Sequence, residues 1–462
     1  WLLSSQPRLW STKLLANVAS SSHNDRPDAY WRSRTSTPTA ANTSSSRLVD
    51  RVNPEVHDAT GRARGCRRRD DVGVHPLVRV GRPTPLPDAE RQAILDAPVF
   101  GESFSDHMVL MRWADGAWGP IEVHPFGPLS LSPATLALHY GQSIFEAFKA
   151  YAQADGSVAV FRIEANATRM NRSAERLAMP PLPEGAFEQS CVALVDADRA
   201  WVPTSDGSAL YVRPFLFGVE AHLSVRPANE YLYAVIASPV ASSFGPVLGA
   251  ISVAAGPVDV RATPGGTGAV KFAGNYAAGF RAHGRADAAG GDQVLWLDAV
   301  EHRWVEELNA MNVMFLWERD GHTVLTTPPL SGTILEGVTR ASLLEVARDS
   351  GGELRIDEVV EEPTSIEDVR DGIEDGTLLE MFACGTAAVI VPIGRLIDAG
   401  VTRVVGTGDP GGLTMALRSA LLDIQYGRTA DTRGWMRTVD PADQRRHVGR
   451  MSGGNGATSA AA

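Results

Sequence analysis

Lys271 is the residue whose type and surroundings best suit chemistry in this sequence. It lies in Gly265–Tyr276, where glycines and apolar residues surround one lysine just before a helix expected to begin at Asn275. An amine in apolar surroundings loses hydration of its charged form, so its pKa falls and the neutral amine becomes available. A neutral amine forms a Schiff base with an aldehyde, and glycines let the backbone approach a flat ligand closely. Taken alone, the pattern does not separate a reactive amine from the solvated surface charge that most lysines are.

Three other segments have residue types that bind anions or hold a ring nitrogen. Gly337–Arg340 begins an expected helix, whose free N–H groups and dipole suit a phosphate, although any helix start has these features. Gly385–Ala387 follows an expected strand, where a turn and a hydroxyl suit a second anion. Glu306 and Glu307 form an acidic pair that is either a solvated edge or the source of one buried carboxylate. Such a carboxylate keeps a pyridine nitrogen protonated and makes the ring an electron sink.

The elements that must position these residues alternate between strands and helices from residue 85 onwards. A hairpin is expected at Met108–Trp113 and Ala117–Val123, and a helix followed by a strand within Leu136–Tyr151. Further strands are expected at Leu210–Phe217, Tyr231–Ser238, Gln293–Asp298, Asn312–Trp317 and Leu378–Phe382. Further helices are expected at Ala165–Leu177, Asn275–Arg285, Thr339–Ser350 and Thr414–Ile424. The pattern predicts a mixed α/β fold in two parts.

The predicted domain organisation has two folded parts between two tails. A smaller α/β domain is expected at 84–238 and a larger, ligand-binding domain at 251–440, joined by a linker at 239–250 that is rich in Pro, Gly and Ser. Residues 1–83 are expected to be a disordered basic tail, and residues 441–462 a flexible C-terminal tail. The segment is alternatively a targeting peptide, because it is rich in Arg and Ser and poor in acidic residues, or a basic tail that makes weak contacts with anions. It is also alternatively non-native sequence, because the chain begins with Trp.

Charge and composition exclude several classes of function. Residues 1–83 hold 14 basic and 7 acidic side chains, so the remaining chain, at a total net charge of −11, is near −18 and would repel a nucleic-acid backbone. The uncharged stretch 231–258 is long enough to cross a membrane, but three prolines interrupt it, so two buried strands around a loop are expected instead. Three distant cysteines and scattered histidines indicate no disulfide framework and no metal site.

One formal motif does not carry its usual meaning. The spacing Gly406-x-Gly408-x-x-Gly411 matches a dinucleotide fingerprint. Pro410 lies inside it, however, and no βαβ unit follows before the chain ends. We therefore expect a loop there rather than a nicotinamide site.

Several segments together resemble, in order, the motifs of the fold-type-IV pyridoxal-phosphate aminotransferases. Along the chain they are Leu138-His139-Tyr140-Gly141, Phe145-Glu146, the Lys271 segment, Glu307–Asn312, Leu335–Arg340 and Cys384–Ala387. The segments Tyr211-Val212-Arg213-Pro214, Val294–Leu297 and Ile424–Gly427 are similar to the branched-chain aminotransferases within that group. The resemblance covers roughly residues 84–440. It implies a two-domain fold with a smaller N-terminal and a larger C-terminal domain, the cofactor pyridoxal 5'-phosphate, and a homodimer.

The resemblance also implies a role for individual residues. Lys271 would carry the cofactor and move the proton between the substrate and the cofactor, and Glu307 would pair with the pyridine nitrogen. Tyr276 would hydrogen-bond the phenolic oxygen of the ring. The phosphate would be held by Arg169, Val338, Thr339 and Thr386. The substrate pocket would be lined by Tyr140, Phe145, Tyr211, Arg213, Ala310 and Ala387. Without the resemblance, each of these residues is equally an ordinary core or surface side chain.

The implied activity is transfer of an amino group between leucine, isoleucine or valine and 2-oxoglutarate, with Tyr211 and Arg213 receiving the distal carboxylate of the second substrate. The expected location is the cytoplasm, with organelle import as the alternative. Ala147, Ala273 and Asn309 replace glycines that are common in the family. The open alternatives are a D-amino-acid aminotransferase, an aminodeoxychorismate lyase, and a cofactor-binding protein whose catalysis is impaired.

Overall fold

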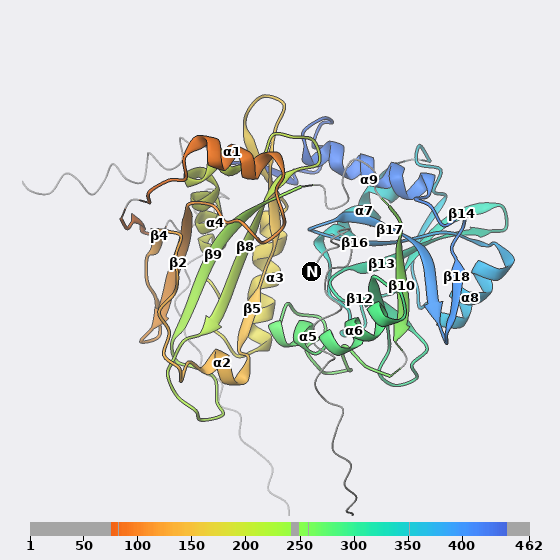
Figure 1. Ribbon diagram of the computed structural model, residues 1–462, viewed down its shortest axis with the longest axis horizontal. Helices are drawn as coiled ribbons and strands as arrows, with labels where there is room; N and C mark the ends of the chain where they lie inside the picture. The colour runs from red at the N-terminus through yellow and green to blue at the C-terminus, as the bar shows by residue number, and fades with distance from the viewer. Residues whose placement is uncertain (1–74, 82, 242–248, 257, 351, 441–462) are drawn as a thin grey trace, which may run out of the picture. The chain divides into compact units, whose positions relative to one another are not determined.

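The computed structural model describes most of the chain from residue 75 to residue 440. The described ranges are 75–81, 83–241, 249–256, 258–350 and 352–440. Within them the strands form two sheets, which Figure 1 shows as separate groups around β8–β9 and around β13–β17. Most of the tail expected at 1–83 and the tail at 441–462 lie outside the described residues, as does the centre of the expected linker.

The first sheet has the strand order β1-β4-β2-β9-β8-β6-β7-β19, with β3 pairing β2 and β5 pairing β8. Its strands are β1 Leu77–Arg79, β2 His107–Ala114, β3 Ala117–Trp118, β4 Ile121–Pro125, β5 Ser143–Phe145, β6 Phe148–Ala152, β7 Val158–Phe161, β8 Ala209–Gly218, β9 Tyr231–Val240 and β19 Met436–Thr438. The helices along this part of the chain are α1 Asp88–Asp96, α2 Leu136–Tyr140, α3 Ile163–Arg176 and α4 Ala186–Ala197, followed by a 3-10 turn at Arg199–Trp201. The expected hairpin is confirmed, with β2 pairing both β3 and β4.

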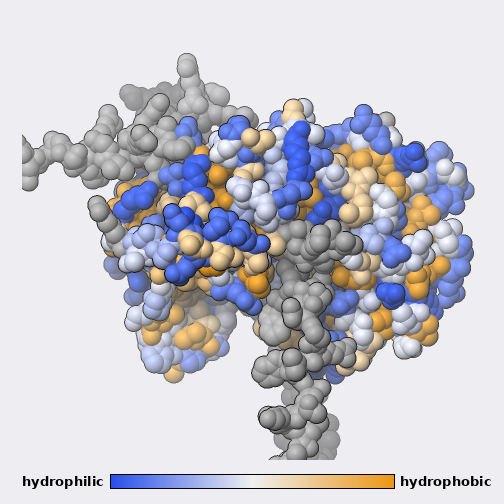
Figure 2. Space-filling view, turned by 45° about the horizontal axis from the view of Figure 1, so that its top comes forward, coloured by the Kyte–Doolittle hydropathy of each residue, from blue (hydrophilic) through white to orange (hydrophobic). Residues whose placement is uncertain are grey.

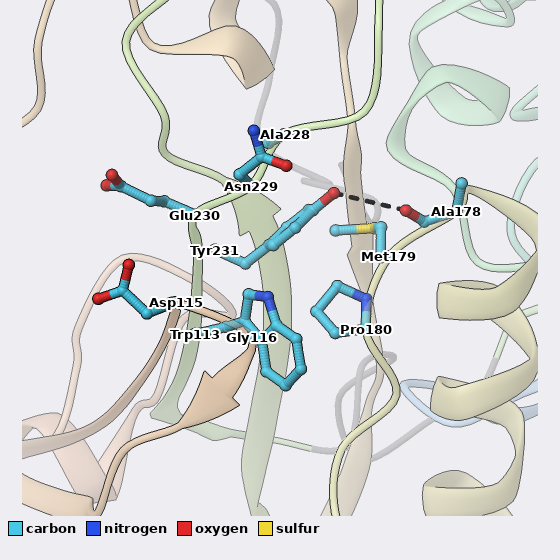
Figure 3. Close-up of a pocket in the computed structure, with 10 residues that line it drawn as sticks. All are labelled: Trp113, Asp115, Gly116, Ala178, Met179, Pro180, Ala228, Asn229, Glu230 and Tyr231. Carbon is cyan, nitrogen blue, oxygen red and sulfur yellow. Dashed lines mark hydrogen bonds between the residues drawn. The ribbon is translucent and has the colours of Figure 1, made fainter.

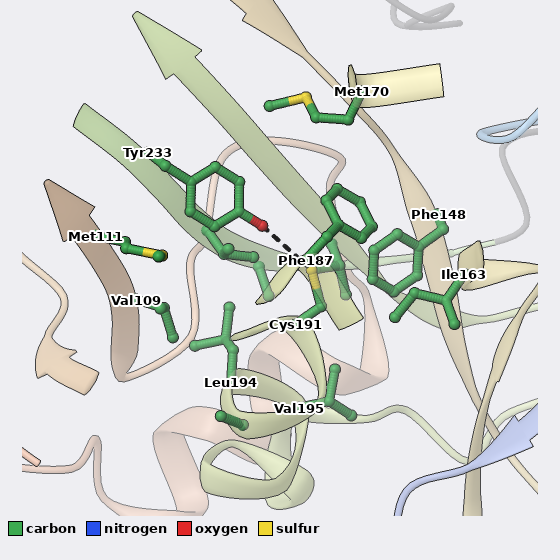
Figure 4. Close-up of a cluster of buried hydrophobic side chains, with 14 of the residues drawn as sticks. Val109, Met111, Phe148, Ile163, Met170, Phe187, Cys191, Leu194, Val195 and Tyr233 are labelled. Atoms are coloured by element: carbon green, nitrogen blue, oxygen red, sulfur yellow. Dashed lines mark hydrogen bonds between the residues drawn. The ribbon is translucent and has the colours of Figure 1, made fainter. Parts of the chain in front are cut away.

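A helical apolar stripe fixes α4 against the first sheet. Its buried side chains include Phe187, Cys191, Leu194 and Val195, which are spaced to lie on one face of the helix. Figure 4 shows these side chains meeting Val109, Met111 and Tyr233 from β2 and β9. Each buried side chain of this size contributes about 1.5–3 kcal/mol of transfer free energy. The rigid sheet that results carries β5, β6 and β8, which reach the candidate site.

The second sheet has the order β12-β11-β10-β17-β16-β13-β14-β15, with β18 pairing β17 and an additional pairing of β12 with β13. Its strands are β10 Ile251–Gly256, β11 Gln293–Leu297, β12 Val305–Leu308, β13 Asn312–Arg319, β14 His322–Thr327, β15 Glu358–Glu361, β16 Leu378–Gly385, β17 Val389–Asp398 and β18 Val401–Val404. Its helices are α5 Ala273–Ala277, α6 Phe280–Ala288, α7 Val338–Asp349, α8 Ile366–Asp375 and α9 Gly412–Gln425.

Both faces of the second sheet are covered, which explains why β13 is a continuous apolar run rather than an alternating one. Met314 and Leu316 pack in one core cluster with residues of α7 and α9. Phe315 and Trp317, on the opposite face, pack in another cluster with residues of α8. Both faces of β13 are therefore buried from solvent.

The structure differs from the sequence expectations at three places. Leu77–Arg79 pairs in parallel with β4, so ordered structure begins before the expected boundary at 83. The single helix expected from Asn275 is two helices, broken before Gly279, where a Cβ would meet Asn309 Oδ1 at 3.2 Å and the Trp296 ring at 3.3 Å. β19 pairs with β7, so the last described strand returns to the first sheet. The division into two domains at 239–250 remains a prediction.

The uncharged stretch 231–258 contains the strands β9 and β10, as expected, with the residues between them partly outside the description. None of the helices in the described ranges has the length and apolar character needed to cross a bilayer. Figure 2 shows polar and apolar residues interspersed on the face in view.

Candidate active site

A small cavity gathers side chains from α3, from the Lys271 loop and α5, and from the second sheet with its loops. Most of its residues come from the Lys271 loop, the β12–β13 turn, the start of α7 and the β16–β17 turn. Its lining consists of Arg169, Lys271, Tyr276, Glu307, Asn309, Ala310, Met311, Asn312, Leu335, Gly337, Val338, Thr339, Cys384, Gly385 and Thr386. Eight residues selected in the sequence for cofactor or substrate therefore share one cavity. They are Arg169, Lys271, Tyr276, Glu307, Ala310, Val338, Thr339 and Thr386.

Lys271 is held by its backbone and directed by its side chain. Its N–H donates to Ser173 Oγ at 3.1 Å, and its carbonyl oxygen accepts from the N–H of Phe145 at 3.1 Å. Its Nζ donates to the hydroxyl of Tyr276 at 3.1 Å. Burial, and then the nearby positive charge of Arg169, lower the pKa of the Lys271 amine to about 8. The neutral amine is therefore available near neutral pH, as the glycine-rich setting predicted.

Tyr276 completes a compact group around this amine. Its ring lies 4.9 Å from the ring of Phe145, measured between centroids, and Lys271 Nζ lies 4.9 Å from the Phe145 centroid. Burial, and then the charge of Glu307, raise the pKa of the Tyr276 hydroxyl. The hydroxyl stays protonated at neutral pH, so it can donate a hydrogen bond to an oxygen anion of a ligand.

Arg169 does not face the cavity as an isolated cation. Its Nε donates to Glu146 Oε1 at 2.7 Å and its Nη2 to Glu146 Oε2 at 2.8 Å, and both side chains are almost fully buried. Its Nη1 donates to the carbonyl oxygen of Glu336 at 3.0 Å. Glu146 belongs to one of the motifs found in the sequence, but no role was predicted for it. The two charges compensate each other, so this pair alone is nearly neutral.

Glu307 is a buried carboxylate rather than part of a solvated edge. It lies on β12 with 4 % of its surface exposed, and it accepts from Asn312 Nδ2 at 2.9 Å and from the Leu335 N–H at 3.2 Å. Burial raises the pKa of the Glu307 carboxyl to about 7, against the lowering effect of Arg261, whose Nη1 lies 3.1 Å from Glu307 Oε1. Glu306 points elsewhere, because its carboxylate accepts from the hydroxyl of Thr333.

Arg261 is a residue of this site that the sequence reasoning missed. Besides Glu307, its guanidinium contacts the carbonyl oxygens of Gly268, at 3.4 Å, and of Thr333. It thus connects the Lys271 loop, β12 and the loop before α7. Its position only ten residues before Lys271 was a weak signal, because a loop arginine is ordinarily a surface residue.

The anion end of the cavity is formed by a helix start and a turn. The first residues of α7, Val338 and Thr339, and the turn after β16, with Thr386, line the same cavity. Gly337 is needed at this helix start, because a Cβ there would lie 2.0 Å from Asn312 Oδ1. The Thr386 hydroxyl donates to the carbonyl oxygen of Ala147 at 3.3 Å. The N–H groups of a helix start suit the oxygens of a phosphate.

The expected substrate residues are partly assembled beside Lys271. Arg213 Nη2 donates to the Tyr211 hydroxyl at 2.8 Å, and its guanidinium lies 4.8 Å from the centroid of the Phe145 ring. Arg213 Nε is buried without a partner among the described residues. Ala310 lines the cavity, and Ala387 lies in the β16–β17 turn. Tyr140 is not brought to this group within the chain, because its hydroxyl donates to Leu223 O at 2.6 Å and 43 % of its surface is exposed.

The replacements of common glycines do not strain the backbone. Ala147, Ala273 and Asn309 all lie outside the left-handed region of φ. Asn309 also gains a partner, because its Oδ1 accepts from Trp296 Nε1 at 2.7 Å. A hydrogen bond therefore fixes the ring-facing loop at the position where the sequence raised doubt.

A wider depression of about 630 Å³ lies elsewhere, between the β2–β3 turn and the start of β9. Figure 3 shows its lining, in which Tyr231 donates to the carbonyl oxygen of Ala178 at 3.4 Å beside Asp115, Glu230 and Trp113. It contains no amine, and none of the residues that surround Lys271. Within the described ranges, no three His, Cys, Asp or Glu side chains are grouped to hold a metal ion.

Comparison with known proteins shows which family the chain resembles. Residues 143–396 match the family model of the class IV aminotransferases. The chain is 50 % identical over 357 residues to a probable branched-chain-amino-acid aminotransferase of Streptomyces coelicolor, covering 77 % of this chain and 96 % of the relative. It is 46 % identical to the branched-chain-amino-acid aminotransferase of Mycobacterium tuberculosis, covering 76 % of this chain and 95 % of the relative.

Solved structures share the fold. A T.th. branched-chain amino acid aminotransferase with pyridoxamine 5'-phosphate has a TM-score of 0.58 at 28 % identity, covering 71 % of this chain and 98 % of that chain. The branched-chain amino acid aminotransferase from Escherichia coli has a TM-score of 0.56 at 25 % identity, covering 72 % of this chain and 99 % of that chain. The cofactor of the class is pyridoxal 5'-phosphate, whose requirements for an amine, a buried carboxylate, a phenol and a phosphate site are met by the residues of this cavity. The chain therefore belongs to the class IV aminotransferases, and within them its similarity is to the branched-chain-amino-acid aminotransferases.

Proposed function

We propose that this protein transfers the amino group between leucine, isoleucine or valine and 2-oxoglutarate. The observation that carries the proposal is the Lys271 amine, which has a lowered pKa, bonds to Tyr276 and shares a cavity with Glu307. The identity of 46–50 % over nearly the full length of relatives that are named for this activity supports the substrate class. Pyridoxal phosphate, when bound, supplies an aldehyde that accepts the amino group and a ring that accepts electrons.

The roles of the individual residues are part of the same proposal. Lys271 bonds to the cofactor and, once released, moves a proton at its Nζ as base and then as acid. Glu307 holds the proton of the ring nitrogen, and Tyr276 donates to the phenolic oxygen. Binding of the phosphate falls to the N–H groups of Val338 and Thr339, with Arg169 and Thr386. Burial excludes water from this group and so strengthens each of these interactions.

The substrate side combines an apolar wall with one cation. Phe145 and Tyr211 offer aromatic surface, and the small side chains of Ala310 and Ala387 leave room for a branched aliphatic group. One methylene changes binding in such a pocket by only about 1–3 kcal/mol, so the three branched substrates should be accepted together. We assign the distal carboxylate of 2-oxoglutarate to Arg213, whose Nε is buried without a partner among the described residues. The role of Tyr140 in this pocket remains a prediction.

We also propose a homodimer. Leu138, Leu223 and Val225 are 65 %, 62 % and 86 % exposed, and the hydrogen bond from the Tyr140 hydroxyl to the Leu223 carbonyl oxygen brings their two segments together. Exposed apolar groups of this kind are typical of an interface. Analytical ultracentrifugation of Leu223→Glu should show monomer, whereas Val300→Glu, at a position that is 74 % exposed elsewhere, should not change the wild-type state. A monomeric wild type would contradict this proposal.

The cytoplasm is the proposed location, because the described cysteines, Cys191 and Cys384, are buried free thiols. The activity is tested with purified protein supplied with pyridoxal phosphate. We expect visible absorbance that bleaches when L-leucine is added and returns with 2-oxoglutarate, while Lys271→Ala shows neither change. Failure to turn over L-leucine, or turnover of D-alanine or aminodeoxychorismate instead, would contradict the proposal.

A further inference from the structure

Lysine is rare in this protein, and one buried lysine has no role in the proposed chemistry. The chain has three lysines, Lys13, Lys149 and Lys271, against 40 arginines. Only Lys149 and Lys271 fall within the described residues. Arginine remains charged in proteins, whereas a buried lysine can release its proton, so the two are not interchangeable. A lysine at an interior position of an arginine-rich chain indicates that a compact, titratable cation suits that position.

Lys149 lies at the junction of the two sheets. It is on β6, directly opposite Tyr211 of β8, and 5 % of its surface is exposed. Its Nζ donates to the carbonyl oxygen of Ala387 at 2.6 Å, in the turn between β16 and β17. This bond fixes the turn that contains Thr386. Through it, a strand of the first sheet holds a loop of the second.

Lys149 also lines a cavity that continues behind the anion end of the active site. Val338, Thr339 and Thr386 line both this cavity and the one around Lys271. The same cavity contains Gln425, whose Oε1 is buried without a partner among the described residues. The cavity behind the anion end therefore contains a buried polar atom that lacks a hydrogen-bond partner among the described residues.

The charge of Lys149 is not compensated by the chain. Within the described ranges, no carboxylate lies within ion-pair distance of its Nζ. Burial, and then the positive charge of Arg418 on α9, lower the pKa of Lys149 to about 7. Tyr151 lines the same cavity, Tyr211 of β8 pairs with Lys149 in the sheet, and the ring of Tyr426 contacts that of Tyr151. Burial raises the pKa of the Tyr151 and Tyr426 hydroxyls, so neither of these two supplies a negative charge at neutral pH. An anion bound nearby would be the missing counter-charge.

We propose that Lys149 is a positioning residue for the cofactor's phosphate. It fixes the Thr386 turn through Ala387 and supplies a buried positive charge behind the anion end of the active site. This inference rests on the proposed function. Arg169 alone does not suffice for a phosphate dianion, because Glu146 already compensates its charge. A lysine suits the position because it can lose its proton beside Arg418 when the phosphate is absent and regain it when the phosphate binds.

The first test compares two cofactor forms that differ only in the phosphate. Apoprotein of Lys149→Met should bind pyridoxal phosphate roughly tenfold or more weakly than wild type, because one partly buried charge interaction is lost. Its affinity for pyridoxal, which has no phosphate, should be unchanged, and Lys149→Arg should restore part of the loss. Lys13→Met is the matched control and should bind as wild type. Equal weakening for both forms would overturn the inference, as would an unchanged affinity for pyridoxal phosphate combined with a raised KM for leucine.

The second test measures the protonation of Lys149 in the wild-type protein, and a variant serves only to assign its signal. Lysine labelled with ¹³C at Cε gives three signals, and Lys149→Arg identifies the one from Lys149. Its pKa should rise when inorganic phosphate or pyridoxal phosphate is added. The favourable charge is then present below the apoprotein pKa and is lost as pH rises through the bound-state pKa. A pKa that does not move would refute the inference, even if leucine turnover is intact. If leucine is not turned over but this pKa rises, the proposed activity fails and the phosphate role stands.

Discussion

Replacing Arg261 with glutamine should change the pH dependence of the enzyme more than its fold. Arg261 Nη1 lies 3.1 Å from Glu307 Oε1, and the two side chains are 4 % and 5 % exposed. Breaking such a pair ordinarily costs about 3–5 kcal/mol, because one charge is left buried without a partner. Glu307 avoids this cost by taking up a proton, since its pKa is already about 7 with the arginine present. We therefore expect a structural loss of only about 1–3 kcal/mol, the value for imperfectly satisfied buried hydrogen bonds.

The catalytic effect follows from the same protonation. Loss of an adjacent cation raises a carboxyl pKa by about 1–3 units. A rise of about two units, to roughly 9, would leave only ~3 % of Glu307 ionised at pH 7.5. The ring nitrogen would then lack its anionic partner in most molecules. About three quarters of Glu307 is ionised at pH 7.5 in wild type, so we expect kcat to fall roughly 25-fold at this pH and to recover toward wild type as pH rises through the raised pKa.

The assay is kcat for leucine and 2-oxoglutarate, measured from pH 6.5 to 9.5 at saturating cofactor. Arg261→Lys should keep most of the wild-type profile, because it retains a cation. Arg281→Gln serves as a control for loss of an arginine at a position that is 72 % exposed. A profile for Arg261→Gln that coincides with wild type, or a loss that is equal at every pH, would refute the reasoning.

Three other changes test the remaining residues. Tyr276→Phe removes the hydroxyl that lies 3.1 Å from Lys271 Nζ, and losing a hydrogen bond to a charged group, about 1.5–3 kcal/mol, should lower kcat roughly 10- to 100-fold. Stopped-flow measurement of the two half-reactions checks this, and an unchanged rate would refute it. Arg213→Met should raise the KM for 2-oxoglutarate roughly 100-fold and change the KM for leucine less than about threefold. Equal changes of the two KM values in steady-state kinetics would contradict the assignment of the distal carboxylate to Arg213. Because the pKa of Lys271 is lowered to about 8, the rate of cofactor attachment to apoprotein should rise with pH up to about 8 and level off above it, and a rate that rises steadily to pH 10 would show an ordinary amine.

The local elements were largely predictable because their periodicity is strong. The strands β8, β9, β11, β13 and β16 all form where alternating or continuous apolar runs predicted them. The helix predicted after Lys271 was less accurate, because two helices form there, and Gly279 between them lies close to Asn309 and Trp296 from other segments. Boundaries set by contacts with distant segments are not encoded in the local pattern. For the same reason the strand β1 and the return of β19 to the first sheet were missed.

The reactive residue types of the site were predictable from the sequence, but the ion-pair partners of its charged groups were not. Lys271, Tyr276 and Glu307 have residue types and an order along the chain that indicate the cofactor, and the structure brings them into one cavity. Residue types alone did not decide which of the two adjacent glutamates faces that cavity. The resemblance pointed to Glu307, and in the structure Glu307 lines the cavity while Glu306 accepts from Thr333.

The sequence by itself determined the residues that can react, because a reactive group is a property of its side chain and near neighbours. Only the tertiary structure decided their protonation and partners. Arg169 is paired by Glu146, Glu307 is held by Arg261, and the charge of Lys149 is left without a carboxylate among the described residues. The physical reason is that a pKa depends on burial and on charges a few ångströms away, and the folded chain brings those charges from segments that are distant in sequence.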